Sequence, residues 1–123
     1  MNTPADSATW PRTETEALAV QDALRGQVDA SDHSPRPGAP GSLIAGLDVA
    51  YDDERDVVAA AAVALDAQSL HVVAQATALG RVTFPYVPGL LAFREIPPLL
   101  DALAVLREQL GRDPGLLVCD GYG

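Results

Sequence analysis

Three apolar segments follow one another in the middle of the chain, separated only by short polar turns. They span residues 43–51, 57–65 and 70–78, and each has the length and the bounding turn residues of a β-strand. The alanine-rich second segment would also suit a helix, but its position between two turn-like segments favours a strand. Because strands joined by short loops pair in antiparallel fashion, the sequence predicts a three-stranded antiparallel meander.

A long amphipathic helix is predicted after the meander, at residues 95–111. Two prolines suit its first turn, Gly111 suits its C-terminal cap, and the apolar stripe consists of Leu99, Leu103, Leu106 and Leu110. Residues 116–119 then form a short buried strand. A strand that is reached through a helix runs parallel to its neighbour, so the predicted architecture is α/β.

The N-terminal region has a different composition from the rest. Residues 1–41 are expected to form a tail, a helix and a proline-rich linker, and residues 42–123 the folded domain. Thr13 and Glu16 have the spacing of a capping box, which predicts a helix over residues 13–28. The apolar stripe of this helix predicts the inward-facing residues, which are Leu18, Leu24 and Val28.

Two carboxylates occupy unusual positions in the predicted sheet. Asp48 lies within an otherwise apolar central strand, where an isolated buried charge is costly, so a partner or a metal is expected. The alternative is that Asp48 lies at the strand end and hydrogen-bonds a turn. Asp120 follows the last strand directly, in the place where ligand-binding groups collect in open α/β sheets.

A proline-rich segment connects the meander to the long helix. Pro85 and Pro88 enclose Tyr86 and Val87, so this segment is a stiff loop and neither a regular helix nor a central strand. A large flat side chain on a rigid base suits insertion between stacked bases. The alternative is a simple connector with a packed aromatic residue and with Glu95 capping the next helix.

Charge and composition restrict the classes of function. The net charge is −9 and every basic residue is arginine, which disfavours a protein that binds nucleic acid through clustered positive charge. Divalent cations held by carboxylates would offset that repulsion. Cys119, the one cysteine, is expected to be a buried structural thiol. With no secretory signal and no apolar run of roughly 20 residues, a cytoplasmic location without a membrane span is expected.

Three motifs occur along the chain in a recognisable order. They are Gly46-Leu47-Asp48-Val49, then Phe84-Pro85-Tyr86-Val87-Pro88-Gly89 followed by Phe93-Arg94-Glu95, and finally Asp120-Gly121-Tyr122-Gly123. Together they resemble the endonuclease V (deoxyinosine 3′ endonuclease) family. The resemblance covers the N-terminal half of such an enzyme, and Tyr122 departs from the asparagine usual in the last motif.

The resemblance implies a ribonuclease H-like fold, incomplete here, and a function. Asp48, Glu95 and Asp120 would be the catalytic carboxylates that bind Mg²⁺. The wedge that opens inosine-containing DNA or RNA would be formed by Pro85, Tyr86, Val87 and Pro88. Arg94 would contact phosphate or form a structural ion pair. The implied reaction cleaves a phosphodiester on the 3′ side of deoxyinosine or inosine, in DNA repair or RNA processing, by a chain expected to be truncated.

Other interpretations remain open at this point. One is a non-catalytic remnant or interaction module with the same half-fold, which would self-associate through an exposed sheet edge near Leu116. Another, an actin-like nucleotide-binding half, rests only on residues 46–49 and lacks a phosphate-binding glycine loop. The sequence leaves open the choice between DNA and RNA, the oligomeric state, and whether this chain folds and acts alone.

Overall fold

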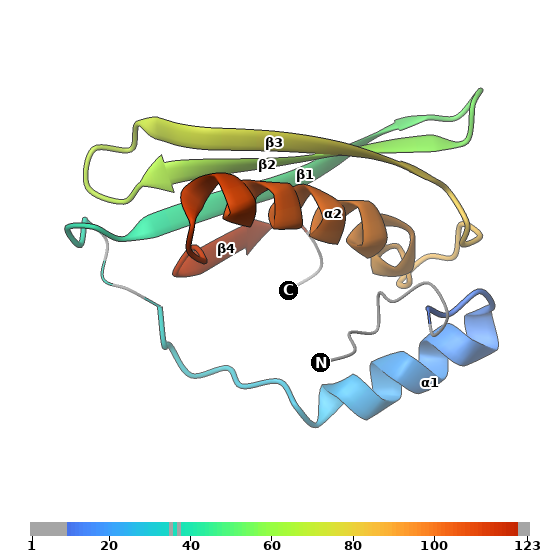
Figure 1. The fold of residues 1–123 in the computed structure, drawn as a ribbon. Coiled ribbons are helices and arrows are strands. Elements are labelled where there is room, and N and C mark those ends of the chain that lie inside the picture. The colour runs from blue at the N-terminus through green and yellow to red at the C-terminus, as the bar shows by residue number, and fades with distance from the viewer. Residues whose placement is uncertain (1–9, 35, 37, 121–123) are drawn as a thin grey trace.

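The computed structural model describes residues 10–34, 36 and 38–120, which form two helices and one four-stranded sheet (Figure 1). Helix α1 spans Glu14–Arg25 and helix α2 spans Ala92–Leu110. The strands are β1 (Leu43–Asp52), β2 (Val57–Asp66), β3 (Val72–Arg81) and β4 (Leu116–Cys119). The predicted α/β architecture is therefore confirmed.

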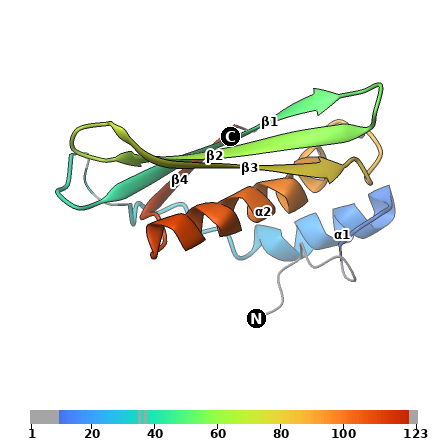
Figure 2. The same cartoon turned by 45° about the horizontal axis from the view of Figure 1, so that its top comes forward.

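The sheet has the strand order β3-β2-β1-β4. Strands β1, β2 and β3 pair in antiparallel fashion, as the meander predicts, and β4 pairs in parallel with β1. Figure 2 shows both helices on the same side of this sheet. Only α2 packs across the sheet, since its crossover from β3 to β4 places it over one face.

The interface between α2 and the sheet is made mainly of small residues. The sheet contributes Ala45, Leu47, Ala60, Ala62, Ala64 and Ala76, and α2 contributes Ala102 and Leu106. The four leucines of the predicted stripe all pack in this core. Small side chains let the helix lie close to the sheet, and a Cβ atom added to Gly80 would lie 3.3 Å from the Cβ atom of Pro98. The core is therefore sensitive to added volume.

Helix α2 begins earlier than predicted. It starts at Ala92, so Pro97 and Pro98 lie inside the helix and outside its first turn. Pro97 has no N–H to donate to the Phe93 carbonyl four residues before it. That carbonyl instead accepts a hydrogen bond of 2.8 Å from the buried indole N–H of Trp10. The Trp10 indole thus replaces the backbone N–H donor that the Phe93 carbonyl lacks because residue 97 is proline.

Helix α1 has the predicted N-terminus but a different buried face. The Thr13 side chain caps the helix by accepting from the Glu16 N–H, as the capping box predicts. The three residues predicted to face inward are instead 48%, 42% and 75% exposed, namely Leu18, Leu24 and Val28. Ala17 and Val20 face the protein, because α1 packs against the proline-rich loop and the start of α2. Neither helix in the described part of the chain combines the length and apolar character required to cross a membrane.

Strand β4 is less buried than predicted. It lies at the sheet edge, where β1 pairs with one side and no strand of the described residues pairs with the other. Leu117 and Val118 are 43% and 54% exposed, and Cys119 is also exposed. The expectation of a buried structural thiol is therefore wrong, because the residue belongs to an edge strand.

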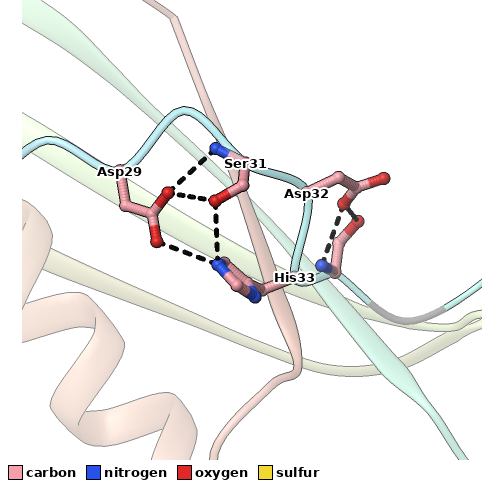
Figure 3. Close-up of polar contacts among 5 residues, drawn as sticks. Asp29, Ser31, Asp32 and His33 are labelled. Atoms are coloured by element: carbon pink, nitrogen blue, oxygen red, sulfur yellow. Dashed lines mark hydrogen bonds and ion pairs between the residues drawn. The ribbon is translucent and has the colours of Figure 1, made fainter.

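The described residues of the linker after α1 are mostly exposed and are organised by local hydrogen bonds. Asp29 accepts from the Ser31 N–H at 2.9 Å, and Asp32 accepts from the Ser34 N–H at 3.0 Å (Figure 3). These are turns in which an aspartate side chain bonds the backbone two residues ahead. Hydrogen bonds from Ser31 lower the pKa of Asp29, and those from Ser34 lower that of Asp32.

Replacing Ala62 by leucine is expected to destabilise the protein by about 1–3 kcal/mol, because the added volume separates α2 from the sheet. Ala61→Leu is the matched control, since the neighbouring side chain lies on the other face of the sheet and is partly exposed. Its effect is expected to stay within about 0.5 kcal/mol. Urea unfolding followed by circular dichroism measures both changes, and equal effects would contradict this account of the core.

Candidate active site

Three carboxylates from three elements line one small cleft. Asp48 belongs to β1, Glu95 to the first turn of α2, and Asp120 follows the last residue of β4. The parallel pairing places Cys119 opposite Leu47, so Asp48 and Asp120 occupy the next positions of adjacent strands. All three carboxylates line a cleft of ≈ 120 Å³ together with Tyr51. The structure thus brings together the acidic residues that the sequence singled out.

Asp48 is exposed, in contrast to the expectation of a buried carboxylate. Leu47 and Val49 belong to the core between the sheet and α2, whereas Asp48 between them in the strand is exposed. Strand β4 pairs with β1 only as far as Leu47. Beyond that point the Val49 N–H donates to a carboxylate oxygen of Asp48 at 2.9 Å. Asp48 is therefore an exposed residue in the lining of the cleft.

The donor set of the cleft suits a hard divalent cation. Carboxylate oxygens are the ligands that Mg²⁺ prefers, and several carboxylates in one cleft repel one another unless a cation joins them. Within the described ranges, however, no three histidine, cysteine, aspartate or glutamate side chains are close enough together to hold one ion. The carboxylates therefore fit a metal by their chemistry and by their shared cleft, but the described side chains are not gathered around one ion position.

The loop between β3 and α2 presents Tyr86 to solvent. It has no regular secondary structure, as predicted, and Gly89 adopts the left-handed φ of 85° that its turn requires. Tyr86 is 68% exposed, and Pro85 and Pro88 beside it are exposed as well, while Val87 packs partly against the protein. The packed aromatic residue of the alternative interpretation is Phe84 and not Tyr86.

An aromatic cluster beneath the loop fixes its base. Phe84 and Leu90 at the two ends of the loop are buried with Phe93 of α2 and Trp10. The Phe93 ring lies 5.5 Å from the Trp10 ring and 5.6 Å from the Phe84 ring, centroid to centroid. Such tilted aromatic contacts have a preferred geometry and add to the burial energy. The exposed part of the loop therefore stands on an anchored base.

Arg94 lies between two tyrosine rings. Its guanidinium carbon is 5.0 Å from the ring centroid of Tyr51 and 5.7 Å from that of Tyr86, within the range of cation–π contacts. The Arg94 Nε atom is buried and has no hydrogen-bond partner in the part of the chain that the structure describes. The sequence suggested a phosphate contact or an ion pair for this residue and did not indicate stacking.

Tyr51 is the residue of the cleft that the sequence reasoning missed. Burial raises the pKa of Tyr51 to about 12, and the neighbouring Glu95 carboxylate adds to this effect. The phenol is nevertheless without a hydrogen bond of normal geometry. It therefore remains neutral at physiological pH. The available signal was an aromatic residue three positions after Asp48, at the end of the same strand.

A cluster of Asp29, Ser31 and His33 contains the residue types of a catalytic triad but not its geometry. Ser31 Oγ and an Asp29 oxygen both contact His33 Nε2, at 3.2 and 2.9 Å (Figure 3). A triad requires the serine and the aspartate on different ring nitrogens. The histidine and aspartate side chains are also largely exposed. This cluster organises the linker and offers no activated nucleophile.

The last sequence motif lies largely outside the described residues. Of its four positions only Asp120 is described, and Gly121, Tyr122 and Gly123 are not. The departure at Tyr122 therefore has no structural account.

The order of elements and the position of the acidic residues define a class of protein. An antiparallel meander, a crossover helix and a parallel strand beside β1, with carboxylates at one end, are the arrangement of a ribonuclease H-like fold. The sequence model of the endonuclease V family matches residues 22–123. The chain belongs to the endonuclease V family.

Individual relatives support this assignment. Endonuclease V of Streptomyces avermitilis is 61% identical over 123 residues, a match that covers 100% of this chain and 51% of the relative. Its crystal structure superposes with a TM-score of 0.84 at 63% identity and covers 94% of this chain and 48% of that one. This chain therefore spans about half the length of the curated relatives it matches.

A solved complex is also similar. Endonuclease V of Ciona intestinalis, bound to a 24mer DNA containing an inosine followed by a ribo-adenosine, superposes with a TM-score of 0.74 at 25% identity. The match covers 89% of this chain and 46% of that one.

Trp10→Phe is expected to cost about 1–3 kcal/mol of stability, because it leaves the buried Phe93 carbonyl without its donor. In a Pro97→Ala background the cost is expected to fall, since residue 97 then has an N–H for that carbonyl. Pro98→Ala is the matched control, because its new N–H would face the Arg94 carbonyl. A double-mutant cycle on urea unfolding measures each coupling. Equal coupling of Trp10 to both prolines would refute the explanation.

Proposed function

We propose that the chain carries the metal-binding carboxylates and the base-opening loop of an endonuclease that cleaves a phosphodiester on the 3′ side of deoxyinosine or inosine. Such an activity would serve DNA repair or RNA processing in the cytoplasm. The observation that carries the proposal is the cleft lined by Asp48, Glu95 and Asp120, together with the exposed Tyr86 that Arg94 connects to it. The inosine-containing DNA in the similar Ciona complex supports the choice of substrate.

The carboxylates would hold Mg²⁺, which when bound orients a water and stabilises the leaving oxygen in phosphodiester hydrolysis. Asp48 reaches the cleft from β1, Asp120 from the position directly after β4, and Glu95 from the start of a helix. Residues on regular elements are held more firmly than residues on loops. Asp48 and Glu95 are therefore held by regular elements, and Asp120 lies next to one, which suits a site whose ligand oxygens must keep fixed positions.

The loop would open the nucleic acid beside the lesion. Pro85 and Pro88 restrict the backbone on both sides of Tyr86, and the aromatic cluster beneath anchors the ends of the loop. A mostly exposed ring on a stiff support loses little conformational freedom when it enters a stack of bases. Pro85, Tyr86, Val87 and Pro88 together would form the wedge.

The acidic character of the chain is compatible with this proposal. A net charge of −9 repels phosphate, but bound divalent cations reverse the local potential in the cleft. The chain spans about half of its curated relatives, so the binding affinity of a whole enzyme is not expected from it alone. A dependence on divalent cations for nucleic-acid binding follows from these charges.

The first measurement is the nicking of a duplex with a single deoxyinosine, and of matched inosine RNA, by the purified chain in Mg²⁺. Asp48→Asn is expected to lower the rate roughly 100-fold or more, since one charged group of the site is lost. Asp53→Asn is the matched control, because Asp53 is exposed in the turn after β1 and does not line the cleft. Cleavage that persists in Asp48→Asn would contradict the assigned role.

Thermal unfolding tests the metal site without activity. Mg²⁺ is expected to stabilise the chain by about 2.7 kcal/mol when its concentration is about 100 times its Kd. The same effect is expected in Asp53→Asn, and a smaller one in Asp48→Asn. A stability that does not respond to Mg²⁺ in any of the three would argue against a cation in the cleft.

A second candidate function is favoured by the exposed strand β4. A non-catalytic module with the same fold would self-associate through this edge, whose backbone groups and apolar side chains are open in the described structure. Parallel or antiparallel pairing of two such edges would join two sheets into one. The carboxylate cleft would then have no role in catalysis.

Val118→Lys is expected to abolish this association, because a lysine on an edge strand hinders strand addition. Val28→Lys is the matched control, since Val28 is 75% exposed beyond the end of α1. Sedimentation velocity over a range of protein concentrations measures the effect. A chain that stays monomeric at every concentration would exclude the self-associating module.

A further inference from the structure

Three consecutive residues at the start of α2 reach three different parts of the protein. Phe93 lies in the aromatic cluster beneath the loop, Arg94 lies between two tyrosine rings, and Glu95 lines the carboxylate cleft. Successive side chains of a helix point in directions about 100° apart, so one turn suffices for this division. The first turn of α2 therefore connects the loop with the cleft.

The stack formed by Tyr51, Arg94 and Tyr86 crosses from the sheet to the loop. Tyr51 belongs to β1, Arg94 to α2, and Tyr86 to the loop between β3 and α2. The guanidinium carbon lies 5.0 Å from one ring centroid and 5.7 Å from the other. The firmest member is Tyr51, because its backbone is paired with β2 opposite Val58.

Arg94 is more buried than Tyr86, as expected if Arg94 supports the exposed Tyr86 ring. The Arg94 Nε atom is buried and has no hydrogen-bond partner among the described residues, so the two tyrosine rings are the contacts that the structure gives the guanidinium. A cation–π contact is stronger where the cation has lost water. Tyr86, in contrast, is 68% exposed, which leaves much of its surface free for a base.

We infer that Tyr51 is a positioning residue, whose ring holds the Arg94 guanidinium in the place from which it orients Tyr86 beside the carboxylate cleft. The inference rests on the proposed function, in which Tyr86 opens the nucleic acid. In this role Tyr51 acts on Tyr86 through Arg94. Its ring carries this role and its hydroxyl does not, so Tyr51→Phe preserves the stack and Tyr51→Leu destroys it.

Nuclear magnetic resonance tests the stack without nucleic acid. Both tyrosine rings are expected to shift the resonance of the Arg94 δ-methylene protons upfield, because the guanidinium lies 5.0 and 5.7 Å from their centroids. If Tyr51 holds the guanidinium in place, Tyr51→Leu also removes the part of the Arg94 upfield shift that the Tyr86 ring causes. The Arg94 protons in Tyr51→Leu then resonate where they do in the Tyr51→Leu/Tyr86→Leu double variant, while Tyr51→Phe keeps the wild-type position.

The amide spectrum of the strands and of α2 shows whether each variant is folded. A Tyr51→Leu chain that is folded and keeps the upfield contribution of Tyr86 overturns the inference. The inference is supported if Tyr51→Leu loses the upfield shifts from both tyrosine rings while the amide resonances of its strands stay unchanged. If Tyr51→Leu does not fold, Tyr51→Val replaces it, with Tyr51→Phe again as the conservative variant.

A fluorescent reporter tests the consequence for nucleic acid. 2-Aminopurine placed beside the inosine brightens when the wedge unstacks it, in a duplex titrated with the chain in Mg²⁺. Tyr51→Leu is expected to weaken this response roughly 3- to 30-fold, the loss that corresponds to one cation–π contact. Tyr51→Phe is expected to restore the response that Tyr51→Leu loses, because it keeps the ring. With a single strand of the same sequence, the difference between the two variants is expected to be smaller.

The two measurements separate the inference from the proposed function. A wild-type chain that leaves the duplex closed refutes the opening function, and the resonance experiment alone then decides whether Tyr51 supports the stack. A wild-type chain that opens the duplex together with an equally active Tyr51→Leu refutes the positioning role. If Tyr51→Leu loses the fluorescence response and Tyr51→Phe keeps it, the opening function and the positioning role are both supported.

Discussion

The hydrogen bond from the Trp10 indole to the Phe93 carbonyl is the interaction on which the arrangement of the loop depends. It exists because Pro97 lacks the N–H that would otherwise bond this carbonyl within α2. The bond joins two residues 83 positions apart and draws the chain before α1 against the start of α2. The aromatic rings that gather around it bury both ends of the proline-rich loop.

The first turn of α2 is thereby held in one orientation, and this orientation determines where its side chains lie in the candidate site. Once Phe93 is held in the aromatic cluster, the helix geometry directs Arg94 toward the tyrosines and Glu95 toward the cleft. The close contact of α2 with the alanine-lined sheet fixes the helix along the rest of its length. Anchoring at both places leaves α2 little freedom to rotate, so the position of Glu95 is set by packing.

The carboxylates meet because of strand order. Asp48 and Asp120 are separated by most of the domain in sequence, and only the parallel pairing of β4 with β1 makes them neighbours. The same pairing leaves β4 at the sheet edge, with Val118 and Cys119 exposed. The strand pairing that assembles the acidic cleft thus also leaves β4 as an open edge strand.

The sequence by itself determined the element types, the meander, the helical stripe of α2 and the motifs of the family, because strand alternation, helical period and turn chemistry are local properties. Only the tertiary structure decided the buried face of α1, the exposure of Asp48 and Cys119, and the stacking of Arg94 between Tyr51 and Tyr86. Each of these depends on a partner distant in sequence or on a position at the sheet edge. The prediction of the buried face of α1 was wrong for this reason. The helix packs on a loop through Ala17 and Val20, and the position of that loop cannot be predicted from the local sequence of the helix.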